Sequence, residues 1–253
     1  MRRLMNAPVF VGASIAWSEP PLPSWLWRTT KTGRDTLGAH DRGSPMRRES
    51  RGVKRDDEGT GRRDDIVRAA TAVFAKLGFA GASLRVLAAA AGMEKGHLTY
   101  YFPTKESLLF EIVNDLHHRF LDGVRQWRSA PVEGDLLLLQ VFENHLRFVF
   151  DFAAPTRVAY DNFRFLTGAR RSKILRQRRE YEHELGALID SCRDSSTIAS
   201  TPTRILTKVV LAQLNWPYQW YSQRGQLSRD DLERMLAERA LASLRPVAWL
   251  RPA

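Results

Sequence analysis

The sequence predicts an all-α protein in which a small helix-turn-helix domain precedes a larger helical domain. Apolar residues recur at the spacing of three and four that is typical of helices, and residues 111–253 contain no alternating strand pattern. A chain of 253 residues can also bury a sizeable core. We expect about nine helices, with the helix-turn-helix domain at 60–110 and a larger all-α domain at 111–253.

The first helix of the small domain is expected to begin near Asp64 and to end at Gly78. Asp64 and Asp65 would place carboxylates in the first turn, where the helix dipole favours negative charge. Gly78 can adopt the left-handed conformation that ends a helix, and Phe79 can then fold back on the helix. The apolar stripe consists of Ile66, Ala69, Ala70, Val73, Phe74 and Leu77.

Two short helices follow and are joined by a tight turn. Ser83 is the expected N-cap of the first, which ends at Gly92. Only Met93 then separates it from a helix over 94–101, so the two must cross steeply, as in a helix-turn-helix. Leu98 and Phe102 are expected in the core, and Thr104 caps a long fourth helix whose stripe is Leu108, Leu109, Ile112, Val113, Leu116 and Phe120.

The helix over 94–101 carries small, aromatic and hydrogen-bonding residues and no carboxylate after its first residue. Such a surface suits the DNA major groove, where side chains reach base edges and phosphates. The run AGMEKGHLTYYFPTKESLL at 91–109 resembles the DNA-binding signature of the TetR family of transcriptional regulators. The chain departs from that signature at Thr99, where a tyrosine is usual, and this puts the base preference in question.

The resemblance implies a role for each matching position. The residues that would face bases are Arg85, Lys95, Gly96, His97 and Thr99. Those that would hold phosphates are Ser83, Tyr100, Tyr101 and Lys105. The alternative for the two tyrosines is that they only pack the small domain.

Composition agrees with this interpretation. The net charge of +11 favours a polyanionic partner, although a basic composition can also reflect a whole proteome. The single cysteine, Cys192, excludes an intramolecular disulfide and suits the cytoplasm. No apolar run reaches the ~20 residues of a membrane-spanning helix, so no membrane partner is expected.

Residues 1–59 are expected to be a disordered leader, because prolines and glycines interrupt any helix. A signal peptide is disfavoured because no small-x-small cleavage site follows the short apolar run. Translation from Met46 is a further alternative. The arginines between Met46 and Arg63 would suit a flexible arm on phosphates, an idea that the acidic residues 56–58 weaken.

The second half predicts helices over 135–152, 155–166, 170–192, 203–221 and 229–244, with Ser228 and Asp231 as a capping box. It contains no constellation for catalysis, so no enzyme, cofactor or metal is expected. His117 and His118 diverge on their helix. The cluster at 180–184 is better explained by the ion pairs Arg176–Glu180 and Arg178–Glu182.

Aromatic residues in this half suggest a pocket for a small molecule. Its expected lining is Trp127, Phe142, His145, Phe148, Phe152, Tyr160, Phe163 and Arg164, with Arg164 meeting an anionic group. Ordinary core packing is the alternative for each of the aromatics. Residues 214–232 resemble a segment of family members that respond to acyl-CoA thioesters or related acids, although Pro217 departs from it.

The resemblance therefore implies a homodimeric repressor that a small molecule releases from a palindromic operator in double-stranded DNA. The last two helices would form the dimer interface through Val209, Val210, Leu214, Leu232, Met235 and Leu236. Ligand would act by pulling on the fourth helix. The alternative is a helical protein that acts through protein partners, and an enzyme ranks third.

Overall fold

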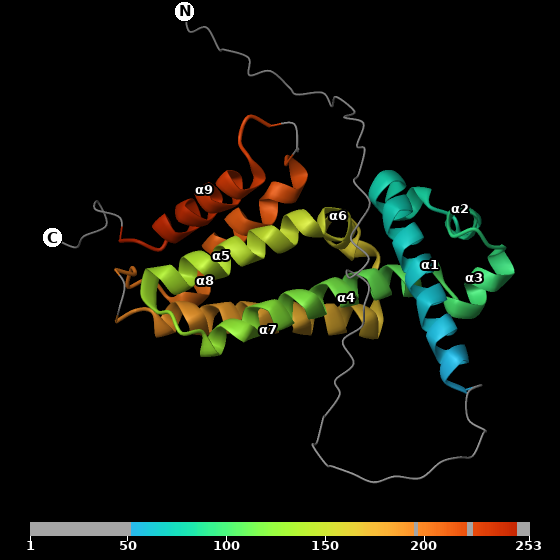
Figure 1. Ribbon diagram of the computed structural model, residues 1–253, viewed down its shortest axis with the longest axis horizontal. Helices are drawn as coiled ribbons and strands as arrows, with labels where there is room; N and C mark the ends of the chain where they lie inside the picture. Colours follow the sequence, from blue (N-terminus) through green and yellow to red (C-terminus); the bar gives the residue numbers. More distant parts are fainter. Residues whose placement is uncertain (1–51, 195–196, 222–224, 247–253) are drawn as a thin grey trace, which may run out of the picture. The chain divides into compact units, whose positions relative to one another are not determined.

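A computed structural model describes residues 52–194, 197–221 and 225–246, with side chains from residue 61 onward (Figure 1). Within these ranges the chain forms nine α-helices, three short 3-10 helices and no strand, which confirms the all-α prediction. None of the helices in these ranges is long and apolar enough to cross a membrane. Residues 1–51 of the predicted leader lie outside the described residues. The predicted domain boundary at residue 110 falls inside α4, Lys105–Arg125, and stays a prediction.

Helix α1 spans Gly52–Gly81 and begins well before Asp64. The prediction that Asp64 and Asp65 occupy its first turn was therefore wrong. No proline interrupts residues 52–63, so this charged stretch can continue the helix. The break at Gly78 was correctly predicted, since its φ of 67° takes the backbone out of helical geometry. The Phe79 ring then folds back onto Phe74, with ring centroids 5.7 Å apart.

The buried face of α1 differs from the predicted stripe. Val67 and Thr71 are buried beside Ile66 and Phe74, whereas Leu77 is 47% exposed. Helix α1 packs against α2, α4 and α6, so its buried face is set by several neighbours that a single period cannot reveal. One consequence is that Leu77, close to the break at Gly78, is left on the outside.

Helices α2, Leu84–Ala90, and α3, Lys95–Tyr101, form the predicted pair. Ser83 caps α2 by accepting a hydrogen bond from the Val86 amide at 3.2 Å. Thr104 caps α4 by accepting from the Ser107 amide at 3.0 Å, and the Ser107 hydroxyl oxygen accepts from the Thr104 amide. Leu98 and Phe102 are buried, as expected for core positions.

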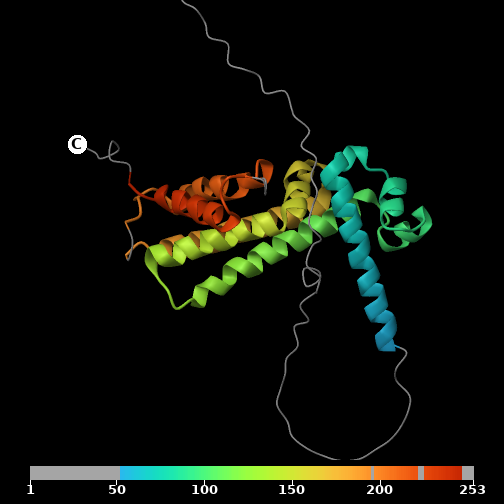
Figure 2. The ribbon, with the colours of Figure 1, turned by 45° about the horizontal axis from the view of Figure 1, so that its top comes forward.

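The larger half is built from α4 to α9. Helix α5, Gly134–Asp151, lies along α9, Arg229–Ala242, in both views (Figures 1 and 2). Helix α7, Gly168–Ser191, packs between α4 and α8, Thr203–Asn215. Helix α6, Ala153–Asp161, packs against α1 and α4. The short helix η2, Gln126–Ser129, follows α4 directly.

Two predicted helices end early. Helix α6 stops at Asp161, and the 3-10 helix η3, Phe163–Phe165, follows Asn162. Helix α8 stops at Asn215 and gives way to the 3-10 helix η4, Trp216–Gln219. Pro217 accounts for the second change, because proline lacks an amide hydrogen and its ring clashes with the preceding helical turn. Ser228 caps α9 by accepting from the Asp231 amide at 3.1 Å.

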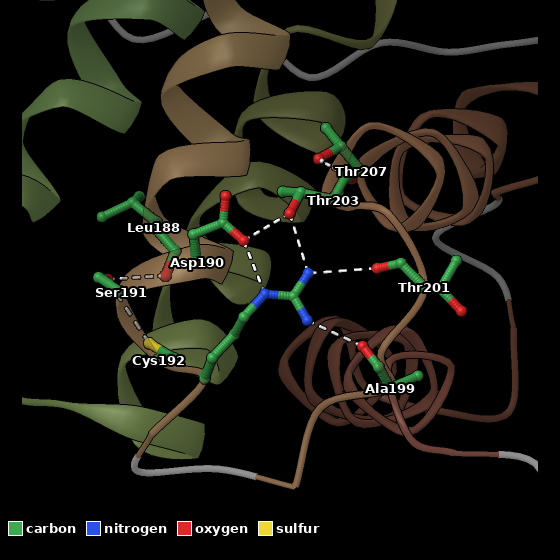
Figure 3. Close-up of polar contacts among 9 residues, drawn as sticks. Leu188, Asp190, Ser191, Cys192, Ala199, Thr201, Thr203 and Thr207 are labelled. Carbon is green, nitrogen blue, oxygen red and sulfur yellow. Dashed lines mark hydrogen bonds and ion pairs between the residues drawn. The ribbon is translucent and has the colours of Figure 1, made fainter.

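Arg193 ties the end of α7 to the segment that leads into α8 (Figure 3). Its Nε donates to Asp190 Oδ1 at 2.8 Å, and its Nη1 donates to the Ala199 carbonyl at 2.8 Å. Its Nη2 donates to the Thr201 carbonyl and to Thr203 Oγ1. A guanidinium offers five donors in a fixed fork, so one side chain can fix a loop at several points. Helix α8 is therefore anchored at its start.

His145 joins three helices inside the larger half. Its Nδ1 lies 2.6 Å from the Tyr181 hydroxyl on α7, and its Nε2 lies 3.0 Å from Asn215 Oδ1 at the end of α8. Because the amide oxygen only accepts, Nε2 carries the hydrogen and Nδ1 accepts from the tyrosine. Burial lowers the pKa of His145 to about 4, which the bond to Asn215 only partly opposes. The imidazole is therefore neutral at neutral pH.

We predict that this buried histidine makes the fold sensitive to acid. Between its ordinary pKa of 6.5 and about 4, the unfolded chain binds a proton that the folded chain does not. The free energy of unfolding should therefore fall as the pH drops through this window. Thermal unfolding followed from pH 7 to about pH 4 should show a smaller loss for His145→Gln than for the wild type.

The matched control is His183→Gln, since His183 is an exposed histidine on α7. It should retain the pH dependence of the wild type. His117 is also buried and neutral, so His145→Gln should remove part of the acid sensitivity and leave the rest. Identical pH profiles for the wild type and His145→Gln would contradict the prediction.

Candidate nucleic-acid interface and ligand pocket

The exposed surface of α2 and α3 carries most of the predicted DNA contacts. Arg85 projects from α2, and Lys95, Gly96 and His97 occupy the first turn of α3, all of them exposed. The hydroxyl of Thr99 donates to the Gly96 carbonyl at 2.9 Å, so it already has a partner within its own helix. Within α3 no carboxylate follows the N-cap Glu94, which leaves a surface of cations and neutral donors.

Tyr100 is highly exposed on this surface, with 84% of its area accessible. This exposure argues against the alternative that Tyr100 only packs the domain. Tyr101 is partly buried, and its ring meets the Tyr100 ring edge-on at 5.4 Å between centroids. Ser83 is exposed, and its hydroxyl oxygen accepts the cap bond, which leaves its hydrogen able to donate. Contact of these residues with phosphates stays a prediction.

Arg63 has a packing role that the sequence did not reveal. Its guanidinium lies 4.3 Å from the centre of the Phe102 ring and pairs with Glu111 at 3.1 Å. Its Nη1 also donates to the Tyr101 carbonyl at 3.4 Å. Arg63 therefore connects α1 to the end of α3 and to α4. The expectation that this arginine belongs to a flexible arm was wrong.

Lys105 also points to its own chain. Its ammonium donates to the Phe79 carbonyl at 2.6 Å and lies 4.2 Å from the centre of the Phe79 ring. From the other side, the Phe79 amide donates to Asn162 Oδ1 at 2.8 Å, and the Phe165 ring stacks on the Phe79 ring at 4.7 Å. We call Phe79, Lys105, Asn162 and Phe165 the Phe79 clamp. The geometry gives Lys105 a structural partner, and its predicted phosphate contact remains a prediction.

A cavity of about 450 Å³ lies in the larger half. Its walls come from α4, α5, α6, α7, α8 and η4. They are formed by Leu116, His117, Phe120, His145, Tyr160, Arg178, Tyr181, Glu182, Lys208, Leu211, Ala212, Asn215, Trp216 and Tyr218. A mostly apolar wall with few polar groups is typical of small-molecule sites.

Only His145 and Tyr160 of the predicted pocket residues line this cavity. Phe142 is fully buried in the core, and Trp127 packs against that core from its edge. The remaining predicted residues, Phe148, Phe152, Phe163 and Arg164, are also absent from the lining. Helical periodicity finds the apolar positions of α5 but does not tell which of them face a hollow. The end of α6 at Asp161 also moves Phe163 and Arg164 into η3, beyond the predicted helix.

The cations of the pocket are Arg178 and Lys208. Arg178 Nε donates to His117 Nε2 at 3.3 Å, and its guanidinium lies 4.1 Å from the centre of the Phe163 ring. Lys208 pairs with Glu182 at 3.1 Å. The expected pair Arg178–Glu182 is therefore replaced by one between helices. The expected pair Arg176–Glu180 is replaced in the same way, because Glu180 bonds to Arg125.

Burial sets the protonation states around Arg178. Burial, together with the charge of Arg178, lowers the pKa of His117 to about 3, so its imidazole is neutral and can accept the Arg178 hydrogen bond. Burial raises the pKa of Tyr160 to about 12, which keeps its hydroxyl protonated at neutral pH. Burial also lowers the pKa of Arg178. In the described part of the chain no group of three or more histidine, cysteine or acidic residues is placed to bind a metal.

The predicted dimer residues divide into three sets by their exposure. Val210 and Leu214 are buried in the core of their own chain, so their assignment to an interface was wrong. Val209 and Met235 remain exposed, by 41% and 40% respectively. Leu232 and Leu236 are partly buried. The side of α8 that faces the core carries the more continuous apolar stripe. Only the opposite side of this helix can contact a partner subunit.

Comparison with known proteins gives two matches along the chain. Residues 66–112 match the family model described as bacterial regulatory proteins, tetR family. Residues 138–244 match the model described as tetracyclin repressor-like, C-terminal domain. The HTH-type transcriptional regulator RutR of Escherichia coli K12 is 32% identical over 81 residues. That match covers 31% of this chain and only 38% of RutR.

Solved structures extend the similarity to most of the fold. A TetR-family regulator from Bordetella parapertussis is 25% identical and has a TM-score of 0.64, covering 76% of this chain and 98% of its own. The regulator AibR, in complex with isovaleryl coenzyme A and operator DNA, is 21% identical and has a TM-score of 0.64. It covers 73% of this chain and 98% of its own. With a helix-turn-helix match in one half and a repressor-like match in the other, the chain belongs to the TetR family of bacterial transcriptional regulators.

Proposed function

We propose that this protein is a ligand-responsive repressor that binds operator DNA through α2 and α3. The observation that carries the proposal is the exposed surface of α3, where Lys95, His97 and Tyr100 project and no carboxylate follows the N-cap Glu94. Cations and hydrogen-bond donors on an exposed helix suit the phosphates and base edges of the major groove. The family match over residues 66–112 supports the same reading.

The protein acts as a homodimer in this proposal. Ile205, Val209 and Trp216 are exposed apolar residues of α8 and η4, and Met235 is exposed on α9. An apolar surface shared by two neighbouring helices can pack against its own copy about a twofold axis. Two recognition helices would then lie about one DNA turn apart, ~34 Å, and read a palindrome.

The effector pocket communicates with the end of α1, just before α2, through the Phe79 clamp. Leu116, His117 and Phe120 of α4 line the pocket, and Lys105 at the start of the same helix holds the Phe79 carbonyl. Tyr160 of α6 lines the pocket, and Asn162 directly after that helix holds the Phe79 amide. The pull on α4 expected from the sequence is thus joined by a second route through α6.

Helix α6 is also bonded to the pocket wall at η4. Arg157 Nη2 donates to the Tyr218 carbonyl at 3.1 Å, and the Tyr218 hydroxyl donates to Asp161 Oδ1 at 3.2 Å. A ligand that repositions η4 therefore shifts α6 and, with it, the clamp. The ligand releases DNA only if it binds the released state more tightly than the DNA-bound state. The complex of AibR with an acyl-CoA and operator DNA supports an acyl compound or carboxylate as the effector class.

We predict that His97→Ala changes which DNA sequences bind. Sequences enriched from a random DNA pool by the wild type define the operator, and its single-base variants test specificity. Loss of a base contact should cost ~1–3 kcal/mol on the best sequence and relax selectivity at one base position in each half-site. His183→Ala, which changes an exposed histidine of α7, should bind like the wild type. No enrichment would overturn the DNA-binding proposal, whereas unchanged selectivity in His97→Ala would overturn only the assignment of this residue.

We predict that Val209→Asp combined with Met235→Asp splits the dimer, because burying two carboxylates in each subunit's interface is unfavourable. Sedimentation at micromolar concentration should give a dimer for the wild type and a folded monomer for the double variant. Ala169→Asp, at an exposed position near the start of α7, is the control and should remain dimeric. A wild-type monomer that still bound a palindrome tightly would contradict the dimer model.

A further inference from the structure

Arg178 is the arginine of the pocket lining, and its hydrogen-bond partners within the described residues carry no negative charge. Its two hydrogen bonds within the chain are long, 3.3 Å to His117 Nε2 and 3.5 Å to the Ala159 carbonyl. Both partners are neutral. Among the described residues no carboxylate oxygen lies within the 4.0 Å of a salt bridge, because Glu182 pairs instead with Lys208. Glu182 acts on Arg178 only from beyond direct contact. A partly buried cation with no carboxylate in direct contact is costly, and a bound ligand anion would lower that cost.

The surroundings of Arg178 hold it in place without using all of its donors. The Phe163 ring lies 4.1 Å from the guanidinium carbon, and the Tyr160 ring lies 5.6 Å from it. The bonds to His117 and Ala159 use Nε and Nη2, so part of the guanidinium fork remains for a ligand. A fork of this kind can bind both oxygens of a carboxylate. The protonated Tyr160 hydroxyl is a further donor on the same wall.

The rest of the lining limits the size and charge of the ligand. Leu116, Phe120, Leu211 and Trp216 supply apolar and aromatic surface. The volume of about 450 Å³ lies in the lower part of the ~300–1,000 Å³ range of ligand pockets. Lys208, the other cation of the lining, is already neutralised by Glu182. A coenzyme A group, with several phosphate charges, would find too few cations here.

We propose that Arg178 binds the carboxylate of a compact aromatic or acyl acid, and that the free acid rather than its coenzyme A thioester occupies this pocket. The proposal rests on the assignment of the pocket as the effector site of a regulator. It replaces Arg164, the arginine expected from the sequence, which is exposed and lies outside the lining.

The test compares acids with their primary amides, which have the same shape without the charge. A panel of phenyl-substituted and branched short-chain acids, their amides and their coenzyme A thioesters is titrated into the full-length protein by calorimetry. We expect at least one acid to bind the wild type, with its amide at least tenfold weaker. Arg178→Gln should lose at least tenfold in affinity for that acid and keep its affinity for the amide.

Two further variants control the interpretation. Arg179→Gln, at the adjacent exposed arginine, should bind the acid like the wild type. Arg178→Lys keeps the charge and should retain part of the affinity, since an ammonium lacks the planar fork. If Arg178→Gln does not fold, the proposal is tested by comparing the affinities for acid and amide in the wild type and in Arg178→Lys. Equal affinity for acid and amide, or binding of thioesters without binding of any acid, would overturn the proposal.

Operator binding is measured separately, so the two proposals can fail independently. A protein that binds its operator but none of the acids keeps its proposed role as a DNA-binding regulator and overturns the Arg178 assignment. If the protein binds an acid through Arg178 and stays bound to its operator, the anion site is supported and the proposed ligand-induced release of DNA is contradicted.

Discussion

The connection between the two halves of the protein depends on the peptide groups of one residue, Phe79. Gly78 turns the chain out of α1 with a φ of 67°, which exposes the amide and the carbonyl of Phe79 to other helices. The Asn162 side-chain oxygen accepts a hydrogen bond from the amide, and the Lys105 ammonium donates one to the carbonyl. Phe74 and Phe165 stack on the ring. Because buried backbone groups must be paired, these bonds cannot be lost without a cost in stability. In the proposed mechanism, movement of α4 or α6 is transmitted through these bonds to the end of α1, next to the helix-turn-helix.

The elements of the fold followed from local signals in the sequence. Gly78, Ser83 and Thr104 each perform the backbone role that their residue type favours, as a break or as an N-cap. The exposed side of α3 could also be predicted, because His97 and Tyr100 occupy a short helix whose inward residue, Leu98, is unambiguous. Early ends of α6 and α8 were missed, although Pro217 carried a signal for the second.

The pocket could not be predicted, because it depends on contacts between residues far apart in the chain. Arg178 was expected to pair with Glu182 one turn away, yet Lys208 of another helix takes that carboxylate. Phe142 and His145 lie on the same helix, and packing alone decides that the first fills the core while the second borders the cavity. Lys105 shows the same limit, since a lysine at a helix start does not reveal the bond that it makes to the Phe79 carbonyl. Non-local packing thus assigned roles that local patterns left open.

Coupling through the clamp is tested most directly by a double-mutant cycle that needs no known effector. Leu211→Trp adds bulk at the pocket wall and stands in for a bound ligand, and Asn162→Ala removes the bond between α6 and Phe79. Affinity for the enriched operator is measured for the wild type, both single variants and the double variant. If the clamp carries the signal, Leu211→Trp weakens operator binding in the wild-type background and has little further effect in the Asn162→Ala background. An equal loss in both backgrounds would show that the signal does not pass through the bond between Asn162 and Phe79.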